Sequence, residues 1–496
     1  MQNPPDPPTI RQALLFFVGV LVASTGLQFS FPHLIGSDGF FHLRMAHSPL
    51  VEMPWMPQSI FGAGWVDHQF LFHLLMTPFT WFVPGLAAAK ASAAFFAALA
   101  LTACYRFLQQ EEVPGAALFA LLPFASSWVF GMRMEMPRAQ SVGLLFLVLG
   151  LMALRRGRPL LLFVLSWAFM ASYHVAILAL PVALLHTAVV GRSRGRFNLL
   201  PSAAVAGGIA AGLTIHPHSP RTFTFLWQHV VQKVGNADRL PVGGEWRDGI
   251  LSLLDTSGQT DGLLQEVVRV ASFAGGPLLL LAGAGLSLYL ARGRRSPEAV
   301  FLLLLGAGAC AGLCAGSKAV EYAAPFSALA LALALRDLSP NWLLSRQVQT
   351  RLGVTLAALL FFQGTWLRSS VVATEAPPDR FAAAAEFLRA EASPGEVIYH
   401  FSWADFPELV WHAPEFRYIV GLDPHFLQLE SPGLWDRYAD LAVCAYANPS
   451  KPIRTLFGAR WALVSLPWRG AEACMMQDPN MKLVFRSEGA LVYRLD

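Results

Sequence analysis

The sequence predicts a mainly α-helical membrane protein, a polytopic bundle of about eleven transmembrane spans followed by a small soluble α/β domain. Three observations support this fold class. The 496-residue chain is 55% hydrophobic and only 14% charged, whereas soluble proteins carry about a quarter charged residues. Apolar runs of membrane-spanning length recur along the first three-quarters of the chain. After Pro377–Pro378 the composition becomes that of a soluble domain.

Basic residues gather in clusters between the apolar runs, which is typical of cytoplasmic loops. The clearest clusters lie at Arg155–Arg158, Gly191–Arg196 and Arg292–Arg295. The net charge of +4 therefore reflects topology, and it gives no support to nucleic-acid binding. If every basic cluster lies on the cytoplasmic side, the chain must cross the membrane an even number of times between neighbouring clusters. The expected spans are residues 12–29, 86–107, 114–130, 139–154, 159–173, 175–190, 199–215, 268–290, 298–316, 320–335 and 351–370.

Two segments need a choice between alternatives. Residues 159–190 are long for one tilted helix and short for two, and charge parity favours two spans hinged near His174. Residues 68–83, "HQFLFHLLMTPFTWFV", are apolar but short. Counting them as a crossing would move the arginine clusters outside, so we expect an interfacial helix along the outer surface. The chain then starts inside and ends outside.

This topology divides the chain at the proline pair. Residues 1–376 form the transmembrane domain, with a first outer loop at 30–84 and a long outer loop at 216–267, and residues 377–496 form an extracytoplasmic α/β domain. In this tail, helices are expected at 381–392 and 431–446, and strands at 396–401, 417–422, 460–467 and 491–496. Cys444 and Cys474 could pair as a disulfide if the tail lies outside the cytoplasm.

The first outer loop concentrates chemistry-bearing side chains. Asp38 and His42 are four residues apart, which places them on one face of a helix, and Arg44 follows. A partly desolvated aspartate can serve as a general base or hold a metal. The alternative is that Asp38 caps the helix and Arg44 reaches to lipid phosphate.

A second acid–imidazole pair, Asp67–His68, lies in the same loop. Its alternative role is to cap the interfacial helix. Two such pairs raise the odds of a functional site. Asp38 and Asp67 are possible metal ligands for Mg²⁺, Mn²⁺ or Zn²⁺, although no strict metal motif is present.

Polar residues elsewhere on the expected outer side suggest anion or sugar binding. Arg133 and Arg138 flank Glu135 in a short loop where the positive-inside rule disfavours arginine, and arginine binds phosphate in a bidentate manner. His174 lies within apolar sequence, where polar residues are expensive. The remaining candidates are Lys318, which could instead pair with Glu321, and Glu245–Trp246 in a Gly-rich loop suited to sugar contacts.

Eight motifs follow one another along the chain: "DGFFHLRMA", "MPWMPQSIF", "GWVDHQFLFHLL", "MPRAQSVGLLFLVLGL", "SYHVAILAL", "IHPHSP", "GGEW" and "YAAPFSALALAL". In this order they resemble the membrane-embedded glycosyltransferases of the GT-C fold, and most of all their uncharacterised bacterial relatives. The likeness covers most of residues 10–335 and the tail more loosely. The chain departs from the family where Pro137–Arg138 replaces an Arg-Pro pair.

The resemblance implies a transferase that moves a sugar from a polyprenyl-phosphate-linked donor to a glycan, lipid or protein acceptor at the outer face of the bacterial inner membrane. Asp38 would be the catalytic base, with His42, Asp67 and His68 beside it. Arg133, Arg138 or Lys318 would stabilise the leaving phosphate. The alternatives are a transporter or flippase of a lipid-linked substrate, and a catalytically inactive scaffold.

Overall fold

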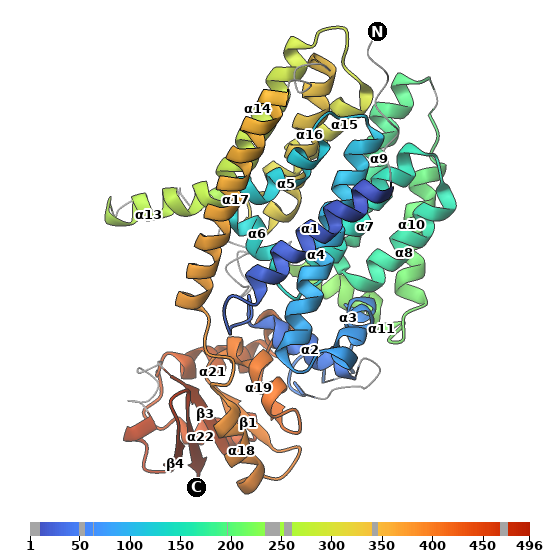
Figure 1. The fold of residues 1–496 in the computed structure, drawn as a ribbon. Coiled ribbons are helices and arrows are strands. Elements are labelled where there is room, and N and C mark those ends of the chain that lie inside the picture. The colour runs from blue at the N-terminus through green and yellow to red at the C-terminus, as the bar shows by residue number, and fades with distance from the viewer. Residues whose placement is uncertain are drawn as a thin grey trace. The chain divides into compact units, whose positions relative to one another are not determined.

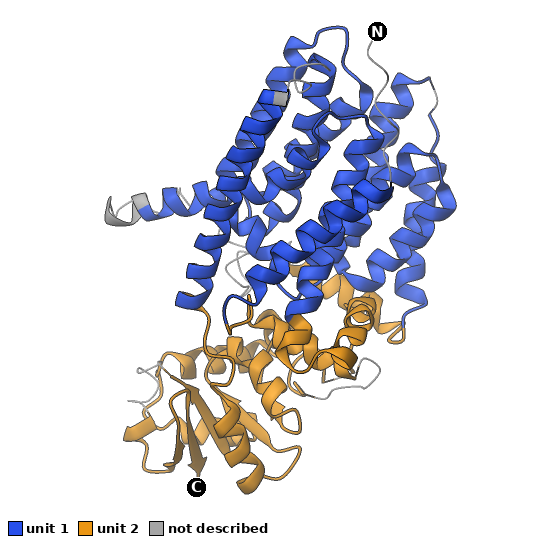
Figure 2. Ribbon diagram, in the orientation of Figure 1, with its two compact units in different colours: residues 1–31, 90–216, 244–373 blue, residues 32–89, 217–243, 374–496 orange. Residues whose placement is uncertain are grey.

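The computed structural model describes residues 10–48, 55–62, 64–195, 197–233, 249–251, 260–339, 346–466 and 475–496. The chain forms two compact units, which are described separately (Figure 2). Unit 1 comprises residues 1–31, 90–216 and 244–373, and unit 2 comprises residues 32–89, 217–243 and 374–496. The expected boundary at 376/377 is close to the border at Thr374, but unit 2 also takes in the first outer loop and part of the long one.

Unit 1 is a helical bundle (Figure 1). Its elements are α1 (Ile10–Gln28), α4 (Leu86–Gln110), α5 (Ala116–Ser126), α6 (Trp128–Glu135), α7 (Gln140–Arg155), α8 (Pro159–Ser172), η1 (His174–Leu178), α9 (Ala179–His186), η2 (Thr187–Gly191), α10 (Leu200–Thr214), α13 (Thr260–Val270), η6 (Ala271–Gly275), α14 (Gly276–Leu290), α15 (Pro297–Gly312), η7 (Ser317–Ala319), α16 (Val320–Leu338) and α17 (Arg346–Thr374). Prolines open α8, α14 and α15 at their first turns, where a missing N–H costs nothing.

Six helices in the described parts of the chain are long and apolar enough to cross a membrane, or seven if the bent pair α5–α6 is one span. The protein is therefore an integral membrane protein. The helix expected at 114–130 bends by 98° at Ser127. The Ser127 hydroxyl accepts the Phe130 N–H at 3.3 Å and starts α6 in a new direction. The break expected near His174 is confirmed, since α8 ends at Ser172 and η1 begins at His174.

Arginines from two of these clusters, Arg155 and Arg194, meet Arg336 at one end of the helices of unit 1. Arg155 bonds Glu298 at 2.5 Å and also pairs with Glu111. Arg336 joins the same Glu111 at 3.1 Å, and Arg194 joins Glu298. Because these residues come from loops that the positive-inside rule assigned to one side, their meeting agrees with the predicted placement of the clusters.

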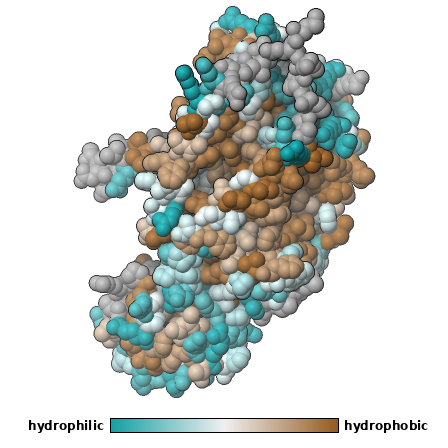
Figure 3. Space-filling view, viewed as in Figure 1, coloured by the Kyte–Doolittle hydropathy of each residue, from teal (hydrophilic) through white to brown (hydrophobic). Residues whose placement is uncertain are grey.

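Unit 2 contains α2 (Asp38–His47), α3 (Phe70–Phe82), α11 (Arg221–Leu226), η3 (Trp227–Gln232) and the tail. The tail comprises α18 (Ala382–Glu391), β1 (Val397–His400), η9 (Trp403–Asp405), α19 (Phe406–His412), β2 (Arg417–Tyr418), α20 (His425–Glu430), α21 (Pro432–Ala442), α22 (Ser450–Phe457), β3 (Trp461–Ser465), β4 (Met481–Arg486) and β5 (Ala490–Leu495). Figure 3 shows apolar side chains over the helices of unit 1 and more hydrophilic ones over the tail.

The five strands of the tail form one mixed sheet in the order β2-β1-β3-β5-β4. β1 pairs in parallel with β2 and β3, placing Ile398 between Tyr418 and Trp461. β5 runs antiparallel to β3 and β4. The sequence predicted β1, β2, β3 and β5 but missed β4. β4 is an edge strand whose residues after Met481 are mostly exposed, so it lacks the buried apolar pattern that marks the others.

One hydrophobic core of unit 2 is shared between the first outer loop and the tail. Phe41, Trp55 and Trp65 from the loop pack with Phe406 and Tyr418 from the tail. The Tyr418 N–H donates to the Trp55 carbonyl at 2.6 Å, and Trp55 Nε1 donates to the Pro414 carbonyl at 2.8 Å. The loop that carries Asp38 thus shares a hydrophobic core with the tail.

Candidate functional site

Asp38 is the first residue of α2, directly after a tight turn in which Gly36 adopts a φ of 80°. Ser37 precedes α2 without a side-chain capping bond, and Asp38 is the acidic residue of the first turn. The turn is held from the tail, because Glu375 Oε1 accepts the Gly36 N–H at 3.2 Å. Burial raises the pKa of Glu375, and the nearby Asp38 carboxylate raises it further. Two acids therefore share the start of α2.

His42, one turn after Asp38, begins a buried hydrogen-bond chain. Its Nδ1 lies 2.9 Å from Nε2 of His73 on α3, and Nδ1 of His73 lies 2.7 Å from Oδ2 of Asp67. All three side chains are at most 3% exposed. Burial would raise the pKa of Asp67, but its interactions with His73, including this hydrogen bond, outweigh burial, so the pKa is lowered.

With a neutral His73, the network assigns the tautomers of both rings. An ionised Asp67 accepts the Nδ1–H of His73, which leaves Nε2 of His73 as an acceptor. His42 therefore donates its Nδ1–H to His73, and the lone pair of the His42 ring lies on Nε2. A histidine held in this way by a second group that is itself oriented is the arrangement used in acid–base catalysis.

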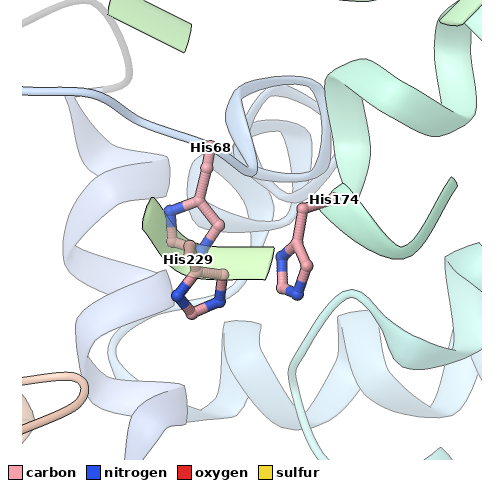
Figure 4. A group of neighbouring side chains, drawn as sticks. All are labelled: His68, His174 and His229. Carbon is pink, nitrogen blue, oxygen red and sulfur yellow. The ribbon is translucent and has the colours of Figure 1, made fainter. Parts of the chain in front are cut away.

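Both carboxylate oxygens of Asp67 accept hydrogen bonds from neighbouring residues. Its second oxygen, Oδ1, accepts the Gln69 N–H at 3.0 Å, so both oxygens have partners. This pattern fits an internal anchor better than the metal ligand that the sequence suggested. Neighbouring His68 points to a different cluster, where its ring lies 5.5 Å from that of His229 (Figure 4). One ring nitrogen of each lies within 4.8 Å of the other, and imidazoles are the usual nitrogen ligands of Zn²⁺.

The His68–His229 pair is packed against aromatic rings and a buried ion pair. Phe225 stacks on both imidazoles, with ring centroids 4.6 and 5.1 Å away. His425 lies 5.3 Å from His229, and Asp423 holds His425 Nδ1 at 2.7 Å while it also pairs with Lys233. Sequence reasoning missed this cluster because its members lie far apart along the chain.

Arg44 lies on α2 and is half-buried. Burial lowers its pKa, and the charge of Glu415 in the tail opposes this. The Arg44 guanidinium therefore lies near the Glu415 carboxylate, which belongs to the same unit. Glu245 and Trp246, the expected sugar contacts, lie outside the described residues.

Unit 1 holds the other predicted residues. Arg133 on α6 is 4% exposed and forms a buried ion pair with Glu321 on α16. The alternative pairing of Glu321 with Lys318 is therefore not what the structure shows. Lys318 Nζ lies 5.9 Å from the centre of the Tyr173 ring, and this ring lies 4.9 Å from that of His174, which Figure 4 also labels. Arg138 follows the end of α6, and its N–H donates to the Met136 carbonyl at 2.8 Å.

The structure thus distributes the predicted site residues over both units. Unit 2 brings together Asp38, His42, Arg44, Asp67 and His68, and unit 1 holds Arg133, Arg138, His174 and Lys318. His73 and Glu375 are the additional residues that contact this set. A signal for His73 was present, because it is a lone polar residue within "FLFHLL".

The chain resembles solved structures over nearly its whole length. The crystal structure of ArnT from Cupriavidus metallidurans bound to undecaprenyl phosphate matches with a TM-score of 0.56 and 16% identity, covering 98% of both chains. The apo structure of ArnT matches with a TM-score of 0.43 and 14% identity, over 97% of this chain and 98% of that chain. The mycobacterial arabinofuranosyltransferase AftD matches with a TM-score of 0.44 and 15% identity, over 98% of this chain and 42% of that chain.

No protein-family model matches the sequence, and no curated protein matches it either. At 16% identity the likeness to undecaprenyl-phosphate-bound ArnT shows the fold. This chain therefore shares the fold of ArnT, which is the GT-C fold that its ordered motifs predicted.

Proposed function

We propose that this protein is an integral-membrane glycosyltransferase that moves a sugar from a polyprenyl-phosphate-linked donor to an acceptor at the outer face of the membrane. The observation that carries this proposal is the likeness in fold, over 98% of both chains, to ArnT bound to undecaprenyl phosphate. The Asp38–His42 turn of α2 supplies the chemistry, because an acid and a tautomer-fixed imidazole stand one helical turn apart.

In the proposed reaction the acceptor oxygen forms a bond to the anomeric carbon of the sugar. The bond from that carbon to the donor phosphate oxygen breaks, and its electron pair leaves with the phosphate. Asp38 takes the acceptor proton as general base. Cationic groups stabilise the phosphate charge, and we assign this role to Arg133, Arg138 or Lys318, as the resemblance of the ordered motifs implies.

We further propose eleven crossings, with the tail on the periplasmic side of the bacterial inner membrane. The bent pair taken as one span, the six long apolar helices and the four shorter apolar helices of unit 1 add up to this number. A disulfide at Cys444 supports an oxidising compartment for the tail. Cys474, its expected partner, lies outside the described residues.

The test is Asp38→Asn in the full-length protein, assayed in nanodiscs with a panel of polyprenyl-phosphate sugars. Loss of the carboxylate should lower the transfer rate about 10²–10⁴-fold with normal protein yield. The matched control is Asp440→Asn on α21, where the side chain is 45% exposed. Wild-type turnover by Asp38→Asn would exclude the base assignment. If the wild type, reconstituted in sealed proteoliposomes, moved lipid-linked sugar across the bilayer without transfer, it would be a flippase, and complete inactivity would favour a scaffold.

A further inference from the structure

A cavity of about 370 Å³ lies within unit 1, among α1, α4, α5, α6 and α17. Its walls are almost entirely apolar, with Leu15, Val20 and Leu27 on the α1 side and Leu360 and Leu367 on the α17 side. Figure 1 shows α1 and α17 on either side of α5 and α6. The cavity is large enough for a segment of hydrocarbon chain, since apolar cavities of about 150 Å³ already bind small apolar molecules.

Among the six long apolar helices in the described part of the chain, the two that flank this cavity are the least buried. Only 6% of the apolar window of α1 and 17% of that of α17 are buried within the protein. Most of their side chains therefore face lipid. Apolar side chains pack densely and leave few large empty spaces inside proteins. A cavity between two lipid-facing helices is therefore occupied by lipid from the bilayer.

Together with the polar Ser24 and Gln363, one charged residue, Glu135 at the end of α6, lines this largely apolar cavity. Its side chain is 2% exposed. Gln28 Nε2 donates to Oε2 at 3.0 Å, and the Ser24 hydroxyl donates to Oε1. Among the residues that the structure describes, no cationic side chain contacts this carboxyl group. Within the described part of the chain, the Glu135 carboxyl group therefore has no cationic partner. Burying a carboxyl group without a cation makes its ionised form costly, so a cation supplied by a ligand would stabilise the carboxylate.

We propose that this cavity binds an aminophospholipid, with an acyl chain between α1 and α17 and the ammonium group at Glu135. A zwitterionic head group brings the missing cation. A polyprenyl phosphate or an anionic phospholipid brings only negative charge to the same carboxylate, which is unfavourable at close range. The site is thus distinct in charge from a donor-phosphate site, and it does not depend on transferase activity.

The test uses the full-length protein in nanodiscs that contain phospholipids with a photoreactive acyl chain, either phosphatidylethanolamine or phosphatidylglycerol. Crosslinks to residues 15–27 and 360–367 are quantified by mass spectrometry. Gly364 lines the cavity, and a Cβ added there meets nothing within 4 Å, so Gly364→Leu should fill the space and remove most crosslinking. Gly353 on the same helix is equally open but does not line the cavity, so Gly353→Leu is the matched control.

The head-group assignment is tested by Glu135→Gln. This change should reduce the preference for phosphatidylethanolamine over phosphatidylglycerol about tenfold, because a charge-assisted contact is lost. Equal crosslinking of both lipids by the wild type would overturn the proposal, as would displacement of phosphatidylethanolamine by polyprenyl phosphate. If Glu135→Gln is poorly folded, Gly19→Leu in α1 fills the same cavity, with Gly26→Leu as its control. Retained crosslinking in both filling variants would also reject the site.

Discussion

The Nδ1 atom of His42 lies 2.9 Å from the Nε2 atom of His73, and this contact joins α2 to α3 across 31 residues of sequence. It connects the turn that carries Asp38 to the buried carboxylate of Asp67, 2.7 Å beyond His73. The contact gives His73 a positioning role, because it fixes which nitrogen of His42 carries the proton.

Replacing His73 should therefore impair transfer without removing any group assigned to the reaction. We expect His73→Leu to lower kcat about tenfold or more while KM changes little, because a buried hydrogen bond to a tautomer-fixed ring is lost. Nitrogen-15 spectra of labelled histidine should show that His42 no longer favours the Nδ1–H form. His47→Leu, an exposed position on the same helix, is the control. An unchanged His42 tautomer in His73→Leu would contradict the assignment.

The shared core predicts that the tail depends on the first outer loop. Trp55 is 2% exposed and packs among tail residues, so Trp55→Ala should destabilise unit 2 by about 3–5 kcal/mol. Limited proteolysis of the full-length protein should then cut the tail at a lower temperature. Trp81→Ala, at a position 71% exposed, should leave the cleavage temperature unchanged. Equal resistance of both variants would show that the tail is independently stable.

The tail should also respond to pH through Glu408. Burial raises the pKa of Glu408 from 4.5 to about 7, although its bonds to Arg380 at 2.7 and 2.9 Å favour the ionised form. Asp405 and Glu375 face the same group and raise its pKa further. Between about pH 4.5 and 7 the folded chain keeps a proton that the unfolded chain has released, so stability falls as the pH rises through this window.

The full effect is at most about 3 kcal/mol. We expect Glu408→Gln to flatten the dependence of the melting temperature on pH between 4.5 and 7. Glu386→Gln, an exposed position on α18, should keep the wild-type slope. A wild-type slope in Glu408→Gln would assign the dependence to another group.

The disulfide at Cys444 predicts the compartment of the tail. In a variant whose free cysteines Cys104, Cys310 and Cys314 are replaced by serine, a membrane-impermeant maleimide should label intact spheroplasts only after treatment with an impermeant reductant. Labelling that requires cell lysis would place the tail in the cytoplasm. That result would refute the proposed topology and the outer-face reaction together.

Much of the fold was predictable because its signals are local. Apolar runs bounded by arginines predicted the helices of unit 1, and charge parity predicted the break near His174. The 98° bend between α5 and α6 was not predicted, since nothing in the apolar run at 114–130 indicates a change of direction. β4 was missed because an exposed edge strand has no buried face to reveal it.

The sequence by itself determined that this is a helical membrane protein with a soluble α/β tail, and that Asp38 and His42 share a helical turn. These features depend on hydropathy and on spacings of a few residues, which one chain displays directly. Only the tertiary structure decided that His73 links His42 to Asp67, that Glu321 pairs with Arg133, and that Trp55 completes the core of the tail. These contacts join residues far apart along the chain, and which polar group satisfies which buried partner is settled by packing in three dimensions.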